Sequence, residues 1–76
     1  MNLYRLYQDY NRGYDTFDSA VVAAESEEEA RKIHPSGYQI TYSSEWCPPE
    51  YVQVEWIGVA TEGMGRGIVC ASFNAG

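Results

Sequence analysis

The sequence predicts a small α+β protein in which one short helix packs on one face of an antiparallel sheet of about four to five strands. Three patterns carry this prediction: an apolar run of strand length at residues 19–24, a helix-capping sequence directly after it, and alternating apolar and polar residues from Tyr51 onward. We expect the element order β-β-α-β-β-β in one domain covering residues 1–76, because a chain this short supports a single core.

The N-terminal segment, residues 3–10, fits two secondary-structure templates. Leucine and tyrosine at positions 3, 6, 7 and 10 have helical spacing, whereas Tyr4 and Leu6 are two residues apart, as in a strand. The tyrosines favour the strand, because aromatic side chains fit a pleated, half-buried surface. A loop over residues 11–18 and a second strand over residues 19–25 are expected to follow.

A helix is expected directly after the second strand. Ser26 and Glu29 have the spacing of a capping box, in which the Ser26 hydroxyl accepts from the Glu29 N–H and the Glu29 carboxylate accepts from the Ser26 N–H. The run of three glutamates also suits the positive end of the helix dipole. Ala30 and Ile33 are placed on the inner face of the helix, and Pro35 ends it.

Three further strands are expected in the C-terminal half. Apolar and polar residues alternate over residues 38–42 and again, for longer, over residues 51–61. The glycine-rich residues 62–67 predict a hairpin, so the final strand, residues 68–74, should pair antiparallel with the strand at 51–61.

Two side chains in these strands have an expected environment. Trp56 shares one face of its strand with Val52 and Val54, so we expect it to pack in the core against the helix. Cys70 lies in an apolar run and is expected to be a small buried apolar side chain. Cys47 and Cys70 could pair only if the fold brought them together, and a cytosolic setting disfavours a disulfide.

The charge of the chain restricts its partners. Eleven acidic residues against five basic ones give a net charge of −6, which argues against direct binding of nucleic acid, where Lys and Arg must displace counterions. The same charge argues against an anionic lipid surface. No apolar stretch approaches the ~20 residues of a membrane span, and the N-terminus lacks the apolar region of a signal peptide. We therefore expect a cytoplasmic protein that contacts no membrane.

No arrangement of residues resembles a catalytic or metal-binding motif. His34 is the only histidine, which rules out a Cys/His zinc module and leaves the serines and cysteines without an assigned base. Gly63, Gly65 and Gly67 precede a strand rather than the helix of a phosphate-binding loop, although Arg66 between them could meet an anion. We expect no enzymatic activity, no cofactor and no metal.

The loop after the first strand is the candidate ligand site. It combines hydrogen-bond donors and acceptors, a cation and an aromatic ring, which suits a nucleotide-derived ligand. Asn74, at the end of the last strand, is expected to complete the pocket. The predicted ligand-binding residues are Asp9, Asn11, Arg12, Tyr14, Asp15, Thr16, Asp18 and Asn74. These residue types are also ordinary turn formers, and the sequence alone favours that interpretation.

The whole chain resembles a group of very small uncharacterised proteins from bacteriophages and bacterial genomes. The segments that carry the resemblance are QDYNRGYDTFDSAVVAAESEEEARKIHP, WCPPEYVQVEWIGVA and SFNAG. The resemblance transfers no functional residue, because such proteins share no agreed catalytic motif. It implies that host takeover or counter-defence is the setting to consider.

Three functions follow as hypotheses. The first is a non-catalytic, phage-type counter-defence protein that sequesters a nucleotide-derived immune signal. The second is an acidic protein-binding inhibitor of a host defence complex, and the third is a small interaction module with no ligand. In each case we expect a homo-oligomer, because one helix covers only one face of the sheet and leaves apolar residues on the other.

Overall fold

The computed structural model describes residues 1–10, 13–37 and 45–74. Its elements are β1 (Asn2–Tyr7), β2 (Thr16–Ala24), the helix α1 (Glu27–Arg31), the 3₁₀ turn η1 (Pro49–Tyr51), β3 (Gln53–Val59) and β4 (Gly67–Asn74). The strand predicted at residues 38–42 lies outside the described residues.

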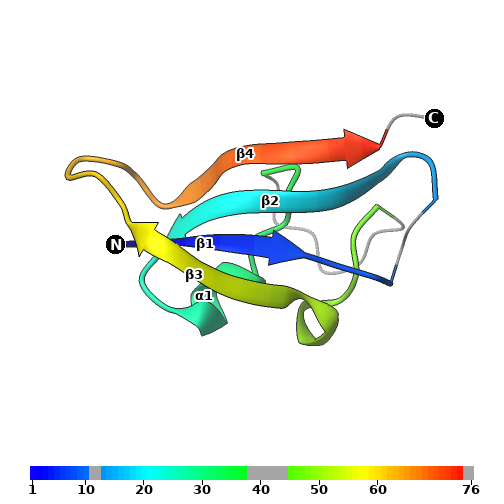
Figure 1. Cartoon of the computed structure of the whole chain (residues 1–76), viewed down its shortest axis with the longest axis horizontal. Helices are drawn as coiled ribbons and strands as arrows, with labels where there is room; N and C mark the ends of the chain where they lie inside the picture. Colours follow the sequence, from blue (N-terminus) through cyan, green and yellow to red (C-terminus); the bar gives the residue numbers. More distant parts are fainter. Residues whose placement is uncertain (11–12, 38–44, 75–76) are drawn as a thin grey trace.

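The strands form one antiparallel sheet in the order β3-β1-β2-β4, and α1 packs on one face of it (Figure 1). The predicted α+β class, with an antiparallel sheet and one short helix, is confirmed. β1 and β2 occupy the interior of the sheet, where Leu6 lies opposite Ala20 and Tyr4 opposite Val22.

The predicted hairpin between the last two strands is wrong. β4 pairs with β2, with Ile68 opposite Val22, while β3 pairs with β1 at the other edge of the sheet. Residues 60–66 connect the two edges across one end of the sheet (Figure 1). Crossing three interstrand spacings takes about 14 Å, and seven extended residues reach about 23 Å. The connection is therefore long enough for β4 to pair with either β3 or β2, and its glycines favour neither pairing.

The helix begins as predicted, but only one of the two predicted capping-box hydrogen bonds is present. Ser26 is the N-cap, and its hydroxyl accepts a hydrogen bond from the Glu29 N–H at 3.2 Å. The Glu29 carboxylate accepts from the N–H of Glu25 at 3.0 Å, so the predicted bond to the Ser26 N–H is wrong. Glu29 thereby joins the end of β2 to the first turn of α1.

The core lies between α1 and the sheet and includes an aromatic residue that sequence patterns missed. Trp46 is 4% exposed, and it packs with Leu6, Val22 and Ala30. The predicted core position of Trp56 is wrong, because this side chain is 59% exposed. Its register opposite Tyr4 puts it on the helix side of the sheet, but β3 is an edge strand and a five-residue helix does not cover it.

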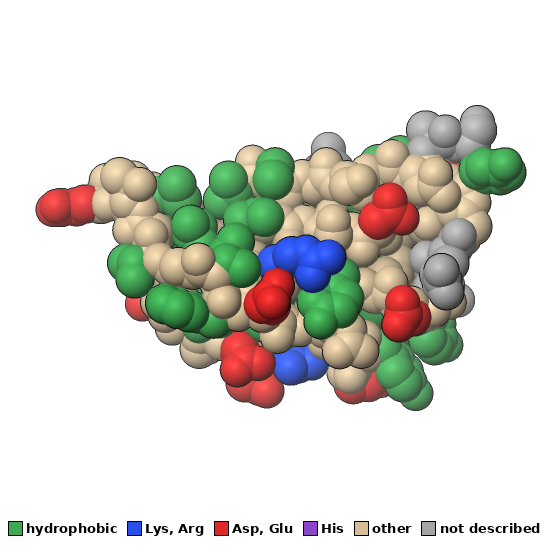
Figure 2. Space-filling model, viewed as in Figure 1, with side chains coloured by type: hydrophobic (Ala, Val, Ile, Leu, Met, Phe, Trp, Pro, Cys, Tyr) green, Lys and Arg blue, Asp and Glu red, His purple; other side chains and the backbone are tan. Residues whose placement is uncertain are grey.

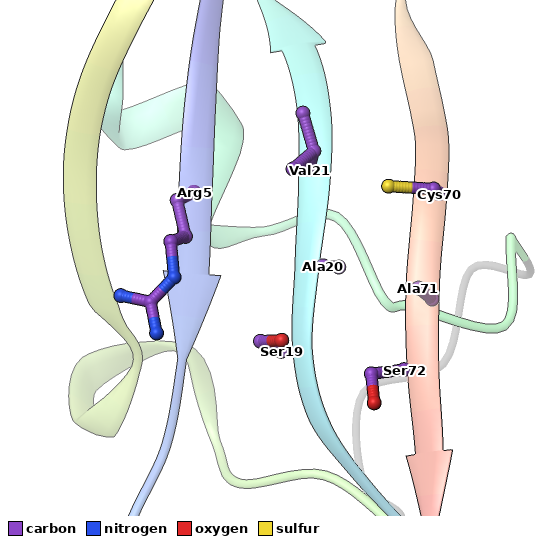
Figure 3. Close-up of a pocket in the computed structure, with 7 residues that line it drawn as sticks. All are labelled: Arg5, Ser19, Ala20, Val21, Cys70, Ala71 and Ser72. Atoms are coloured by element: carbon purple, nitrogen blue, oxygen red, sulfur yellow. The ribbon is translucent and has the colours of Figure 1, made fainter.

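The sheet face opposite α1 mixes charged and apolar side chains (Figure 2). Arg5 on β1 lies 3.7 Å from the Glu55 carboxylate and 4.3 Å from the centroid of the Tyr7 ring. The expected burial of Cys70 is wrong: it lies opposite Val21 and is exposed on this face. Figure 3 shows Arg5, Val21 and Cys70 around a shallow hollow of about 170 Å³.

Candidate functional site

A hollow of about 290 Å³ lies where the end of α1 meets the start of β4. Three consecutive residues after α1 form one wall, and the last residues of the connection from β3 form the other. The lining residues are Glu29, Lys32, Ile33, His34, Gly37, Arg66 and Gly67. Segments 29 or more residues apart in the sequence therefore build this hollow together.

Positive charge is concentrated at this hollow. Lys32 and Arg66 are two of the five basic residues in the chain, and His34 is its only histidine. The whole chain carries a net charge of −6. Lys32 and Arg66 outnumber Glu29, the one carboxylate of the lining that the structure describes, so the hollow is locally positive and can attract an anion although the protein as a whole repels one.

An ion pair fixes the position of Arg66. Its Nε atom lies 2.8 Å from Oε1 of Glu29, the same oxygen that accepts from the Glu25 N–H. Arginine has further donors on its two Nη atoms, and these have no partner among the residues that the structure describes. Arg66 is thus held at the rim of the hollow with donors left for a second acceptor.

His34 forms a buried part of the wall. Its Nδ1 accepts from the Ser36 N–H at 3.1 Å and lies 2.8 Å from the Ser36 hydroxyl oxygen, and its ring meets Phe17 edge-on. Burial lowers the pKa of His34, and the charge of Glu45 opposes this shift. Because Nδ1 accepts from a backbone N–H, the neutral ring carries its proton on Nε2, which is buried and has no partner within the described chain.

The structure brings part of the predicted loop site together. Thr16 Oγ1 and Asn74 Nδ2 both donate to the Gly13 carbonyl, at 2.7 and 3.0 Å, and the Asp15 N–H donates to the Asn74 carbonyl. Asp15 has a φ of 59°, a left-handed turn geometry that Asp tolerates. The predicted contact between this loop and the end of the last strand is present, but Thr16 Oγ1 and Asn74 Nδ2 are used to hold the turn.

The other predicted site residues have different surroundings. Tyr14 is 78% exposed, and Asp18 accepts from the Ser72 hydroxyl at 3.4 Å. Asp9 lines a separate hollow with Tyr10, Tyr51 and Gln53. Asn11 and Arg12 lie outside the described residues.

Sequence patterns missed the cluster at Lys32, His34 and Arg66. The one available signal was Arg66 within the glycine-rich segment, which indicated a possible contact with an anion. Its neighbours could not be predicted, because they depend on the connection that crosses from β3 to β4 beside the end of α1.

Neither cysteine takes part in this site. Burial raises the pKa of the Cys47 thiol and so disfavours its reactive thiolate. Cys70 is a free cysteine on the opposite sheet face. Across residues 1–10, 13–37 and 45–74, no group of three or more His, Cys, Asp or Glu side chains is placed to hold a metal ion. In the same ranges no helix is long and apolar enough to cross a membrane.

The fold and the hollow together define a small antiparallel α+β protein with a cationic surface site on an acidic body. No protein-family model matches the chain, and no curated protein or solved structure matches it.

Proposed function

We propose that this protein is a non-catalytic binding protein that captures a small nucleotide-derived signal by its phosphate groups. The observation that supports the proposal is the meeting of two cationic side chains, Lys32 and Arg66, at one hollow of about 290 Å³. On a chain with a net charge of −6, such a cluster gives a phosphate the local positive potential that it needs to bind.

The size and chemistry of the hollow suit a phosphate rather than a whole nucleotide. Small-molecule sites usually enclose about 300–1,000 Å³, so this hollow holds one end of such a ligand. The Nη groups of Arg66 can donate in pairs to phosphate oxygens, and Lys32 adds a mobile point charge. The backbone at Gly37 and Gly67 carries no side chain that would keep a ligand away.

The loop predicted from the sequence stays a second candidate for the same ligand. Tyr14 offers an exposed ring for stacking, and Asp15 is exposed beside it. Thr16 and Asn74 would shape this site rather than bind, because both already donate to Gly13.

The resemblance to small bacteriophage and bacterial proteins supplies the biological part of the proposal. A phage protein in the host cytoplasm can silence a nucleotide-signalled defence by sequestering the signal. Sequestration needs affinity and no chemical step, so it requires neither a catalytic group nor a cofactor.

Isothermal titration against a panel of cyclic nucleotides and ADP-ribose derivatives tests the proposal. We expect at least one member to bind and Arg66→Gln to weaken it by about 10- to 100-fold, because hydrogen bonds to charged groups contribute about 1.5–3 kcal/mol each. Arg5→Gln, which removes the same charge from the opposite sheet face, should leave the affinity unchanged. If no member of the panel binds, the proposal is wrong.

A second candidate function is an acidic inhibitor that blocks a basic surface on a host defence complex. Glu25, Glu27 and Glu28 are exposed around the start of α1 and favour this alternative. A pull-down from host lysate at low and high salt tests it, since a charge-driven complex weakens with salt. A partner retained at low salt only would support the inhibitor, whereas an empty low-salt pull-down would exclude it.

A further inference from the structure

Two tyrosine rings stack on the surface beyond the end of β1. The centroids of the Tyr10 and Tyr51 rings are 5.0 Å apart, and their planes are inclined by 21°. The two residues are 58% and 53% exposed, and with Asp9 and Gln53 they line a hollow of about 190 Å³. Stacked rings that stay this exposed still offer aromatic surface to a partner.

Buried contacts of neighbouring residues anchor the backbone close to both tyrosines. Gln8, two residues before Tyr10, is buried and donates to the Phe17 carbonyl at 2.9 Å. Val52, directly after Tyr51, is 3% exposed, and its carbonyl accepts from Arg31 Nη1 at 2.9 Å. The backbone next to each ring is therefore anchored, which lowers the ordering cost of binding.

Arg31 also fixes the turn that carries Tyr51. The same Nη1 donates to the Pro49 carbonyl at 3.3 Å, and Arg31 Nη2 lies 3.9 Å from the Glu27 carboxylate. The helix α1 thus positions η1 and the ring at its end. Since the prolines at 48 and 49 restrict the backbone on the other side, the ring is supported from both directions.

Two exposed carboxylates lie at or beside the tyrosine pair. Asp9 lies in the hollow and is exposed, and Glu50 is exposed beside Tyr51. The lining that the structure describes supplies no cation, so a phosphate is disfavoured here. Aromatic ring faces and a carboxylate both attract a positive group.

We propose that the hollow between Tyr10, Tyr51, Asp9 and Gln53 binds the guanidinium group of an arginine side chain on a partner protein. A guanidinium is planar and weakly hydrated, so it stacks on a tyrosine face while its N–H groups reach a carboxylate. Asp9 accepts these donors, and the Gln53 side-chain carbonyl can accept another. Lysine fits less well, because its ammonium is compact and strongly hydrated.

The experiment compares two peptides on the full chain. An alternating Arg–Gly peptide and a matching Lys–Gly peptide are titrated while amide chemical shifts are followed by NMR. We expect the arginine peptide to bind more tightly, with shifts centred on residues 9, 10, 51 and 53. Tyr51→Ala should weaken it by about 2- to 5-fold, the range for an exposed cation–π contact, and Asp9→Asn should reduce its salt dependence.

Two variants serve as matched controls. Trp56→Ala removes an aromatic side chain of similar exposure from β3, and Glu62→Gln removes an exposed carboxylate from the connection before β4. Trp56→Ala should not weaken binding of the arginine peptide as Tyr51→Ala does. Glu62→Gln should not reduce the salt dependence of that binding as Asp9→Asn does. Equal binding of both peptides would overturn the proposal, because it would indicate general attraction to an acidic protein. Binding of adenosine at these residues without binding of the arginine peptide would also overturn it, in favour of a base-stacking site.

Discussion

At the scale of single residues, His34 is the clearest case of a side chain whose properties are set by its fold. Its Nδ1 is committed as an acceptor from the Ser36 N–H, and its ring is buried against Phe17. A proton on Nδ1 would break that acceptor role and charge a buried group. Burial is accordingly the main cause of its lowered pKa.

The lowered pKa of His34 predicts a loss of stability in mild acid. Between the folded pKa and the ordinary value of 6.5, the unfolded chain binds more protons than the folded one, so the free energy of unfolding falls as the pH falls through this window. Urea melts between pH 7.5 and 5 should show this fall, and it should be smaller in His34→Asn, which cannot titrate. An identical pH slope in the two proteins would contradict the prediction.

At the scale of elements, the helix shows which features local sequence encodes. Ser26 marks the start of α1 because an N-cap uses only contacts within one turn, and Ala30 faces inward as its spacing requires. Which side chains of the sheet α1 covers cannot be predicted from the local sequence. The alternation in β3 placed Trp56 on the correct face, but its exposure depends on the reach of a five-residue helix and on the edge position of β3.

Three substitutions rank the contacts that hold α1 and the sheet together. Trp46→Ala should destabilise the protein by about 3–5 kcal/mol, because it empties a buried site. Ser26→Ala should cost about 1 kcal/mol through the lost N-cap. Trp56→Ala should cost much less than Trp46→Ala, because its side chain is 59% exposed. Denaturant melts in which Trp56→Ala is the costliest of the three would place Trp56 back in the core.

Strand order marks the limit of what sequence predicts at this scale. Two strands joined by a glycine-rich segment normally form a hairpin, yet β4 lies beside β2. Both edge positions of the sheet can accept a strand, and only the contacts of the complete core decide between them. The hollow at Lys32 and Arg66 is built by the connection that leads into β4, so its lining also follows from the strand order. The contact of Asn74 with the loop at Gly13 depends on the same strand order.

At the scale of the whole molecule, one helix leaves one sheet face in contact with solvent (Figures 1 and 2). Ile57 is 46% exposed, and Cys70 is an exposed residue that lines the hollow in Figure 3. The Arg5–Glu55 pair puts both signs of charge on this face. A two-fold symmetric pair of copies could therefore match apolar to apolar and basic to acidic residues across the same surface.

The last prediction is that two copies associate through this open face. A standard interface takes about 800 Å² from each partner, roughly a sixth of the 4895 Å² surface of one chain. Ile57→Asp would place a desolvated charge at the seam, so it should weaken the assembly and leave the helix content of the monomer unchanged. Light scattering and circular dichroism measure the two effects, and Thr61→Asp, at an exposed position outside the sheet, is the matched control for added charge. A clean monomer mass for the unsubstituted protein at high concentration would exclude the pair, together with any ligand groove between its copies.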